Sequence, residues 1–149
     1  MPVKPIPDGY HTVTPYLVVE GAAQLIDFLK TAFDAQERFR MDGPDGVVRH
    51  AEVQIGDSRI MMGEACAQQK AMPTMIYMYV NDADALYRRA MAAGATSVAE
   101  PSDQFYGDRH GGVKDASGNL WFIATHKEDV TKEEMERRAQ AAMKQKTAG

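Results

Sequence analysis

An internal repeat constrains this sequence more than any other feature, because the predicted elements of its first half recur in the same order in its second half. A shift of 61 residues carries Val19, which precedes the first predicted helix, onto Val80, which precedes the second. The same shift carries Ile60 onto Trp121, each in the last strand of its half. Each half therefore predicts a strand, a helix and three further strands, which is a βαβββ module.

Turn residues and hydrophobic periodicity define the elements of the first half. Pro15 lies within the first predicted strand and indicates an edge strand or a strand end, because proline cannot donate a backbone hydrogen bond. A helix with a broad apolar face follows, and three strands complete the half. The predicted strands cover residues 12–20, 36–42, 47–55 and 59–64, and the helix covers residues 22–33.

The second half carries clearer helix signals than the first. Asp82 is predicted to cap the start of the helix, and Gly94 to end it. Residues 106–114 are rich in glycine and predict a loop that covers the open side of the sheet. Three strands of this half can be delimited, at residues 74–80, 96–100 and 120–126, and only the repeat predicts the fourth.

Two βαβββ modules predict an α+β fold, in which the strands form a cupped mixed sheet with the helices outside and a shared concave surface between the halves. Thr131 and Glu134 form a capping-box pattern that predicts a C-terminal helix, which either stays solvated or docks on a partner subunit. The predicted organisation is a single domain over residues 1–127, with modules at about 11–64 and 74–126 and a linker at 65–73, followed by a helical tail at 128–149.

Charge and cysteine content narrow the possible partners and compartment. The net charge of −4 provides no basic surface, so we expect no nucleic-acid partner. Cys66 is the single cysteine and cannot form an internal disulfide. No apolar run approaches the roughly 20 residues that a membrane-spanning helix needs. We therefore expect a cytoplasmic protein without a membrane partner.

Strand alternation predicts which side chains face the shared concave surface. In residues 47–55, Val47, Ala51 and Val53 suit packing against the helix, whereas His50 and Glu52 point to the opposite face. These two titratable groups are candidates for catalysis or for ligand binding. Alternatively, they form a cross-strand hydrogen-bonded pair or a solvated surface. The full predicted ligand-binding set is mostly aromatic or methionine: Tyr16, His50, Glu52, Arg59, Met61, Met75, Tyr77, Tyr79, Tyr106, Arg109 and Phe122.

Two members of that set, Tyr106 and Arg109, come from the string YGDRHGG in the glycine-rich stretch. A guanidinium such as that of Arg109 binds a carboxylate or a phosphate through two hydrogen bonds. Alternatively, Asp108 and Arg109 fix the loop by salt bridging and hydrogen bonding. His110 lies near the position that corresponds to His50 under the repeat.

Three segments, together with the repeat, carry a resemblance to a known family: PYLVVEGAAQLIDFLKTAF, HAEVQIGDSRIMMGE and YGDRHGGVKDASGNLWFIATH. They resemble the glyoxalase/bleomycin-resistance/dioxygenase (vicinal oxygen chelate) superfamily, in its PhnB-like branch, over residues 12–129. The resemblance implies the glyoxalase-like fold and a homodimer with a ligand pocket inside each cupped sheet. In many members it also implies a divalent metal ion that four side chains hold.

The metal ligands of that family are histidine or carboxylate side chains on the first and last strands of each half. When the helices and turns are aligned, those positions fall on Thr14, Met61, Met75 and Phe122. None of these side chains is a suitable ligand for a hard or borderline divalent ion. We therefore expect no metal centre and no other cofactor, and a protein that binds an unidentified organic small molecule in an aromatic and methionine-lined cavity.

Two other hypotheses stay open at this point. The protein could be a lyase, isomerase or dioxygenase, which uses acid–base chemistry of His50 and Glu52 or a non-standard divalent-metal site that also includes His110 and His126. The cavity could also be filled by its own side chains, so that the protein acts through its dimer surface and C-terminal helix. The sequence leaves open whether any reaction is catalysed.

Overall fold

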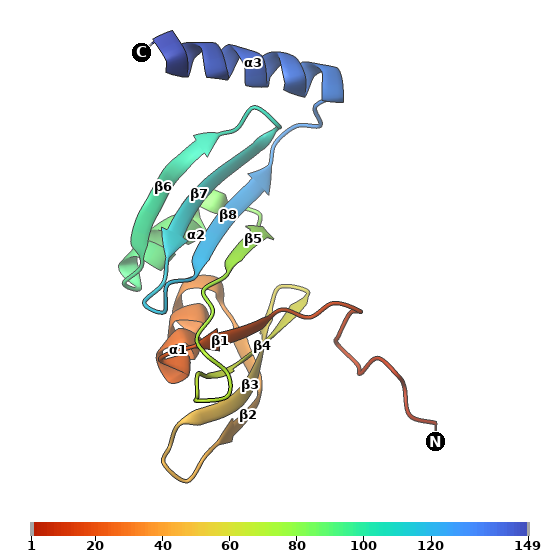
Figure 1. The fold of residues 1–149 in the computed structure, drawn as a ribbon. Helices are drawn as coiled ribbons and strands as arrows, with labels where there is room; N and C mark the ends of the chain where they lie inside the picture. Colours follow the sequence, from red (N-terminus) through yellow and green to blue (C-terminus); the bar gives the residue numbers. More distant parts are fainter. Residues whose placement is uncertain (1, 149) are drawn as a thin grey trace.

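The computed structural model describes residues 2–148 and arranges them as two βαβββ modules and a C-terminal helix (Figure 1). The predicted α+β fold is confirmed. The first module consists of β1 (Tyr16–Val19), α1 (Ala22–Phe33), β2 (Gln36–Asp42), β3 (Val48–Ile55) and β4 (Ser58–Glu64). The second consists of β5 (Met75–Tyr79), α2 (Ala83–Ala92), β6 (Thr96–Asp103), β7 (Asp108–Lys114) and β8 (Leu120–His126), and α3 (Lys132–Ala148) follows.

Each module holds its own mixed sheet of four strands, in the orders β1-β4-β3-β2 and β5-β8-β7-β6. The first strand of each module is an edge strand that runs parallel to the last strand, and the other pairs are antiparallel. Tyr16 lies opposite Met61 in the first sheet, and Tyr77 lies opposite Phe122 in the second. The two sheets therefore share one register at the shift of 61 residues that the sequence predicts.

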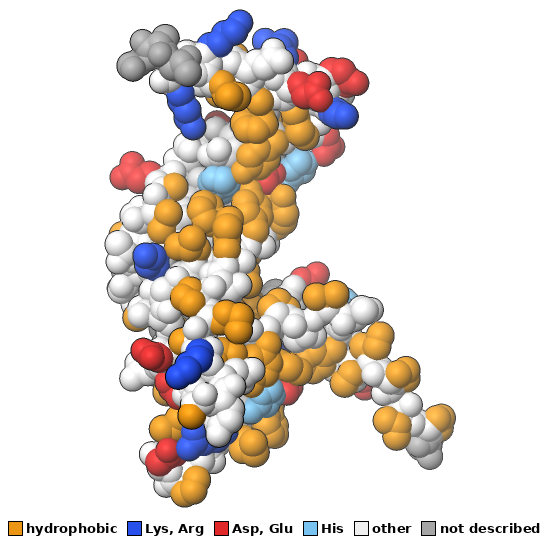
Figure 2. All heavy atoms as spheres, in the orientation of Figure 1, with side chains coloured by type: hydrophobic (Ala, Val, Ile, Leu, Met, Phe, Trp, Pro, Cys, Tyr) orange, Lys and Arg blue, Asp and Glu red, His pale blue; other side chains and the backbone are white. Residues whose placement is uncertain are grey.

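The hydrophobic core lies between the two helices and one face of each sheet, and it is continuous across the modules. Trp121 and Ile123 of β8 are fully buried on the helix side, as alternation predicts. The Phe33 ring at the end of α1 packs against Trp121 with centroids 5.4 Å apart. The helices thus join the modules, and the opposite face of each sheet stays open. Figure 2 shows hydrophobic and histidine side chains gathered over the sheet β5–β8.

Two predicted elements of the sequence were wrong in extent or type. The first strand begins at Tyr16 instead of Thr12, because Pro15 has no N–H to donate, although its carbonyl already accepts a hydrogen bond from Met61 N at 3.0 Å. The predicted loop over residues 106–114 is largely strand β7, which lies between β6 and β8.

The glycines that suggested this loop serve packing instead. A Cβ at Gly112 would lie 2.8 Å from a ring carbon of Phe122, and one at Gly111 would lie 2.9 Å from a ring carbon of Tyr87. A side chain at either position would therefore displace a packed aromatic ring. Glycine in the interior of a strand often marks such a close approach.

The predicted helix signals are confirmed. Asp82 accepts a hydrogen bond from Ala85 N at 3.1 Å, and Gly94 follows the end of α2 with a φ of +107°. At the start of α3, Thr131 Oγ1 accepts from Glu134 N at 3.2 Å. Arg138 of α3 donates to Glu128 and to the carbonyl of Phe105, and so ties the helix to the β6–β7 loop. Over residues 2–148, none of the helices combines the length and apolar character that crossing a membrane requires.

Candidate functional site

The open face of the first sheet carries a hydrogen-bonded histidine and carboxylate. His50 Nε2 lies 2.8 Å from Glu52 Oε2, and His50 Nδ1 lies 3.3 Å from the hydroxyl of Tyr16. The Phe39 ring of β2 flanks the imidazole with centroids 6.0 Å apart. The two side chains therefore form a hydrogen-bonded pair, but within β3 and not across two strands as the alternative predicted. Both ring nitrogens of His50 are engaged within the chain.

Sequence analysis missed a further contributor to this face, Tyr10, which precedes the first strand. Its hydroxyl donates to Glu52 Oε1, and the guanidinium of Arg59 lies 5.2 Å from the centre of its ring. Burial opposes ionisation of Glu52, but hydrogen bonds from Tyr10 and His50 outweigh it and lower the pKa of the carboxyl. No periodic pattern marks the proline-rich lead-in, so the sequence carries no signal for this contact.

The open face of the second sheet is organised around Asp108, whose side chain is only 3% exposed. Its Oδ2 accepts from the hydroxyls of Tyr77 at 2.8 Å and Tyr79 at 2.9 Å. Its Oδ1 lies 2.8 Å from His126 Nδ1. Burial raises the pKa of Asp108, but its three partners lower it further, so that the net shift is downward. The result is a buried carboxylate that stays ionised.

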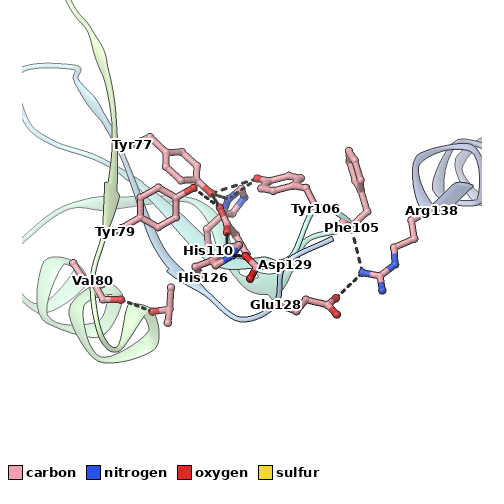
Figure 3. Close-up of polar contacts among 12 residues, drawn as sticks. Tyr77, Tyr79, Val80, Phe105, Tyr106, His110, His126, Glu128, Asp129 and Arg138 are labelled. Carbon is pink, nitrogen blue, oxygen red and sulfur yellow. Dashed lines mark hydrogen bonds and ion pairs between the residues drawn. The ribbon is translucent and has the colours of Figure 1, made fainter. Parts of the chain in front are cut away.

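His110 extends this network toward the β6–β7 loop (Figure 3). Its Nδ1 lies 3.1 Å from the hydroxyl of Tyr77 and 3.1 Å from that of Tyr106. Burial lowers the pKa of His110, so the imidazole is neutral near pH 7. The pKa of His126 is raised instead, because Asp108 and Asp129 accept from its two ring nitrogens.

The two open faces are built on corresponding positions. Tyr16 corresponds to Tyr77 by the register of β1 and β5. Ala51 lies opposite Met62 as Gly111 lies opposite Ile123, so the preceding residues His50 and His110 also correspond. Each face thus carries a histidine whose Nδ1 faces the hydroxyl of the equivalent tyrosine.

Arg109 lies apart from the other predicted ligand-binding residues. Strand alternation places it on the helix side of β7, opposite to Asp108 and His110. Its Nε and Nη2 donate to Asp84 of α2 at 2.9 and 3.1 Å, and Nη1 donates to Asp103 at 3.3 Å. Arg109 therefore ties α2 to the second sheet, and it does not pair with Asp108. Its position was misjudged because the sequence predicted a loop here, where alternation does not apply.

The remaining predicted residues lie at the open faces. Met61 is half-buried beside Glu52, its register partner on β3. Met75 and Tyr79 of β5 are 56% and 64% exposed. A cleft of about 870 Å³ lies between the modules, and residues of both halves line it, including Arg59, Tyr77 and Tyr79. This cleft lies at the junction of the modules, and neither the His50–Glu52 pair nor His110 lines it.

Comparison with known proteins agrees with this architecture. Residues 10–123 match the family model of the Glyoxalase/Bleomycin resistance protein/Dioxygenase superfamily. The chain belongs to this superfamily. Membership of the PhnB-like branch stays a prediction.

Two uncharacterized mycobacterial proteins are similar to this chain over most of their length. An uncharacterized protein of Mycobacterium bovis is 39% identical over 142 residues, which cover 88% of this chain and 91% of that protein. An uncharacterized protein of Mycobacterium tuberculosis strain H37Rv is also 39% identical, and the match covers 88% of this chain and 81% of that protein.

Solved structures show the same fold. TioX from Micromonospora sp. ML1 is 25% identical with a TM-score of 0.67, and the match covers 78% of this chain and 98% of that one. A glyoxalase-related enzyme from Fulvimarina pelagi is 18% identical with a TM-score of 0.63, and the match covers 77% of this chain and 87% of that one. At this identity, the likeness supports the fold alone.

The residues at the superfamily's usual metal positions do not fit a divalent ion. Met61 and Phe122 lie on the open faces, where they offer a thioether and a hydrocarbon ring. The nearest carboxylate, Glu64, accepts from Gly21 N at 2.8 Å and from Ala22 N at 3.0 Å, and so caps the start of α1. Across residues 2–148, no three His, Cys, Asp or Glu side chains are grouped so that they could hold a metal ion.

Asp115, in the segment YGDRHGGVKDASGNLWFIATH that carries part of the family resemblance, has a structural role. It is buried, and its Oδ2 accepts from the indole Nε1 of Trp121 at 2.8 Å. Its Oδ1 accepts from the backbone N–H of Ser117 and Asn119 in the β7–β8 turn. These contacts fix the turn and hold Trp121 in the core, so the role of Asp115 needs no ligand.

Proposed function

We propose that this protein binds an organic small molecule, without a divalent metal ion, in cavities closed between the open sheet faces of two copies of the chain. The aromatic side chains on these faces provide the binding surface, and the tyrosine–histidine pair of the second face provides a polar anchor. The cytoplasm stays its predicted compartment, because the single cysteine has no disulfide partner within the chain.

The exposure of large apolar side chains on both open faces carries this proposal. Tyr16 is 43% exposed on the first face, and Met75 and Tyr79 are more than half exposed on the second. Phe39 and Met41 of β2 are also exposed beside His50. Contiguous apolar surface of this kind marks a binding site for a ligand or for another protein chain.

A homodimer follows from the same surfaces. Each copy has two different open faces, so a two-fold symmetric pair can place the first face of one copy over the second face of its partner. That arrangement closes two equal cavities and covers the exposed side chains. It also leaves α1 and α2, which already pack on each other, outside the cavities.

The metal-free part of the proposal rests on donor chemistry. His50 and His126 each have both ring nitrogens within hydrogen-bond distance of chain partners. A metal ion at either histidine would have to displace a carboxylate that the fold already uses. Both carboxylate oxygens of Glu64 already accept hydrogen bonds from backbone N–H groups at the start of α1. These observations favour sequestration of a ligand over metal-dependent chemistry.

Oligomeric state and ligand binding are tested together on one preparation. Sedimentation equilibrium should give a mass twice the 16.5 kDa of one chain. Substitution Met75→Asp should return the protein to the monomer, because it places a charge in the proposed interface. A library of aromatic fragments should raise the melting temperature of wild-type protein in the presence of a chelator. A monomer that no fragment stabilises contradicts the proposal.

Metal content tests the alternative function. Protein purified without a chelator should contain no stoichiometric metal. Stoichiometric zinc, nickel, manganese or iron that disappears in His50→Ala would overturn the metal-free proposal and favour a metal-dependent lyase, isomerase or dioxygenase with a non-standard site.

A further inference from the structure

The direction of the hydrogen bonds around Asp108 determines how His110 presents its ring. A tyrosine hydroxyl has one proton to donate, and an ionised carboxylate only accepts. Tyr77 therefore gives its proton to Asp108 Oδ2, 2.8 Å away. Towards His110, the oxygen of Tyr77 is left as an acceptor.

The tautomer of His110 follows from this direction. Nδ1 of His110 lies 3.1 Å from the oxygen of Tyr77, so a bond between them requires the proton on Nδ1. If Nδ1 carried no proton, its lone pair would face a lone pair of the Tyr77 oxygen at 3.1 Å, and the two would repel each other. Tyr106 lies equally close to Nδ1, and its oxygen accepts from the same N–H. Burial lowers the pKa of His110, so the ring carries one proton, and Nε2 is bare.

The Nε2 atom is open to a ligand. His110 makes no hydrogen bond through Nε2 to any residue of 2–148, and within the same residues no buried side-chain nitrogen or oxygen lacks a partner. An unpartnered Nε2 is consequently accessible to solvent. Aromatic rings surround the imidazole, with Phe122 at 5.3 Å and Tyr77 at 5.7 Å between centroids.

We propose that His110 Nε2 is the hydrogen-bond acceptor that anchors the ligand, and that the ligand is an aromatic molecule with an O–H or N–H donor, such as a phenol or an N–H heterocycle. This inference rests on the proposed small-molecule binding and names its chemical class. Tyr77 and Asp108 are positioning residues, because they act through the tautomer of His110. His50 cannot play the same role, since Glu52 occupies its Nε2.

A matched pair of probes tests the requirement for a donor. 2-Naphthol and 2-methoxynaphthalene share a ring system, but only the first has an O–H group. Calorimetric titration of the wild-type protein should give about 3- to 10-fold tighter binding of 2-naphthol, the effect of one net hydrogen bond. His110→Phe and His110→Asn should reduce this ratio to about one. Tyr77→Phe should lower the ratio, whereas the control Tyr87→Phe, which removes a hydroxyl that donates to Ser97 on the helix side, should leave it unchanged.

The tautomer of His110 is a second readout that needs neither ligand nor variant. Long-range ¹H–¹⁵N correlation spectra of the wild-type protein should show a bare Nε2 and a protonated Nδ1. A protonated Nε2 overturns the inference. Equal affinity for both probes also overturns it, but leaves small-molecule binding intact. If neither probe binds, both the inference and the proposed aromatic binding site fail.

Discussion

The two open faces have the same scaffold but differ in where the carboxylate lies. On the first face, Glu52 follows His50 by two residues and is half-buried. The position that corresponds to Glu52 on the second face is Gly112, opposite Phe122 as Glu52 is opposite Met61. The second face instead has Asp108, which precedes its histidine by two residues and is almost fully buried.

This difference changes what each histidine can do. Glu52 forms a hydrogen bond with Nε2 of His50, so this nitrogen already has a partner within the first face. Asp108 reaches His110 only through Tyr77, which leaves Nε2 of His110 open. The two faces thus carry equivalent tyrosine–histidine pairs, but their carboxylates lie on opposite sides of the histidine along the strand.

Removal of each carboxylate in turn should give the largest difference in unfolding free energy between the two faces. Asp108→Ala leaves Tyr77, Tyr79 and His126 without their shared acceptor, and should lower the free energy of unfolding by roughly 3 kcal/mol. Glu52→Ala should cost about 1 kcal/mol or less, because water can reach the groups that it leaves. Urea denaturation of the two variants measures the difference, and equal losses would remove the distinction between the faces.

Introduction of a Cβ at Gly112 should have the next largest effect. Gly112→Ala pushes against the ring of Phe122 and should cost about 1 to 3 kcal/mol of unfolding free energy. The double variant Gly112→Ala/Phe122→Met restores the Met61-like side chain of the first face and should recover part of that loss. If thermal denaturation shows no recovery, the clash does not explain the glycine.

The two equivalent tyrosines should respond unequally to loss of their hydroxyls. Tyr77→Phe removes a donor from the buried Asp108 and should cost roughly 1.5 kcal/mol. Tyr16→Phe breaks a 3.3 Å contact at the surface and should change stability by less than about 0.5 kcal/mol. Chemical denaturation of both variants at pH 7 checks the order, and a reversed order would contradict it.

Histidine titration should distinguish His110 from His126. By NMR, the pKa of His126 should lie above 6.5 and that of His110 below it. The His126 contribution is present below pH 6.5 and is lost as pH rises through its raised pKa. His110 disfavours folding as pH falls below 6.5, because its burial opposes protonation. Asp129→Asn should lower only the pKa of His126, and a parallel shift of His110 would contradict their separate environments.

The fold and the facing of side chains were largely predictable from the sequence, because both follow from local periodicity. The βαβββ repeat and the alternation of Trp121 and Ile123 against Phe122 are confirmed. Val47 was wrongly placed in the core. A register shift between β2 and β3 puts Val48 there instead, and such an irregularity has no periodic signal.

The details of the site needed the structure, because they depend on contacts between distant segments. Tyr10 reaches Glu52 from 42 residues away, and Tyr77 reaches Asp108 from 31. Strand β7 was hidden by its glycines, so the orientation of Asp108, Arg109 and His110 could not be inferred from alternation. Glu64, at the end of β4, caps the start of α1, more than 40 residues earlier in the chain, and no local pattern predicts this contact.

Mapping a bound probe by NMR tests whether the open faces bind a ligand without a metal ion. On protein dialysed against a chelator, 2-naphthol should shift the backbone resonances of β3 and β7 at His50 and His110, and leave those around Tyr87 on α2 unchanged. Saturable shifts confined to the open faces would support metal-free binding between them. Shifts that appear only after a divalent metal is added, or that lie on the helix side, would contradict it.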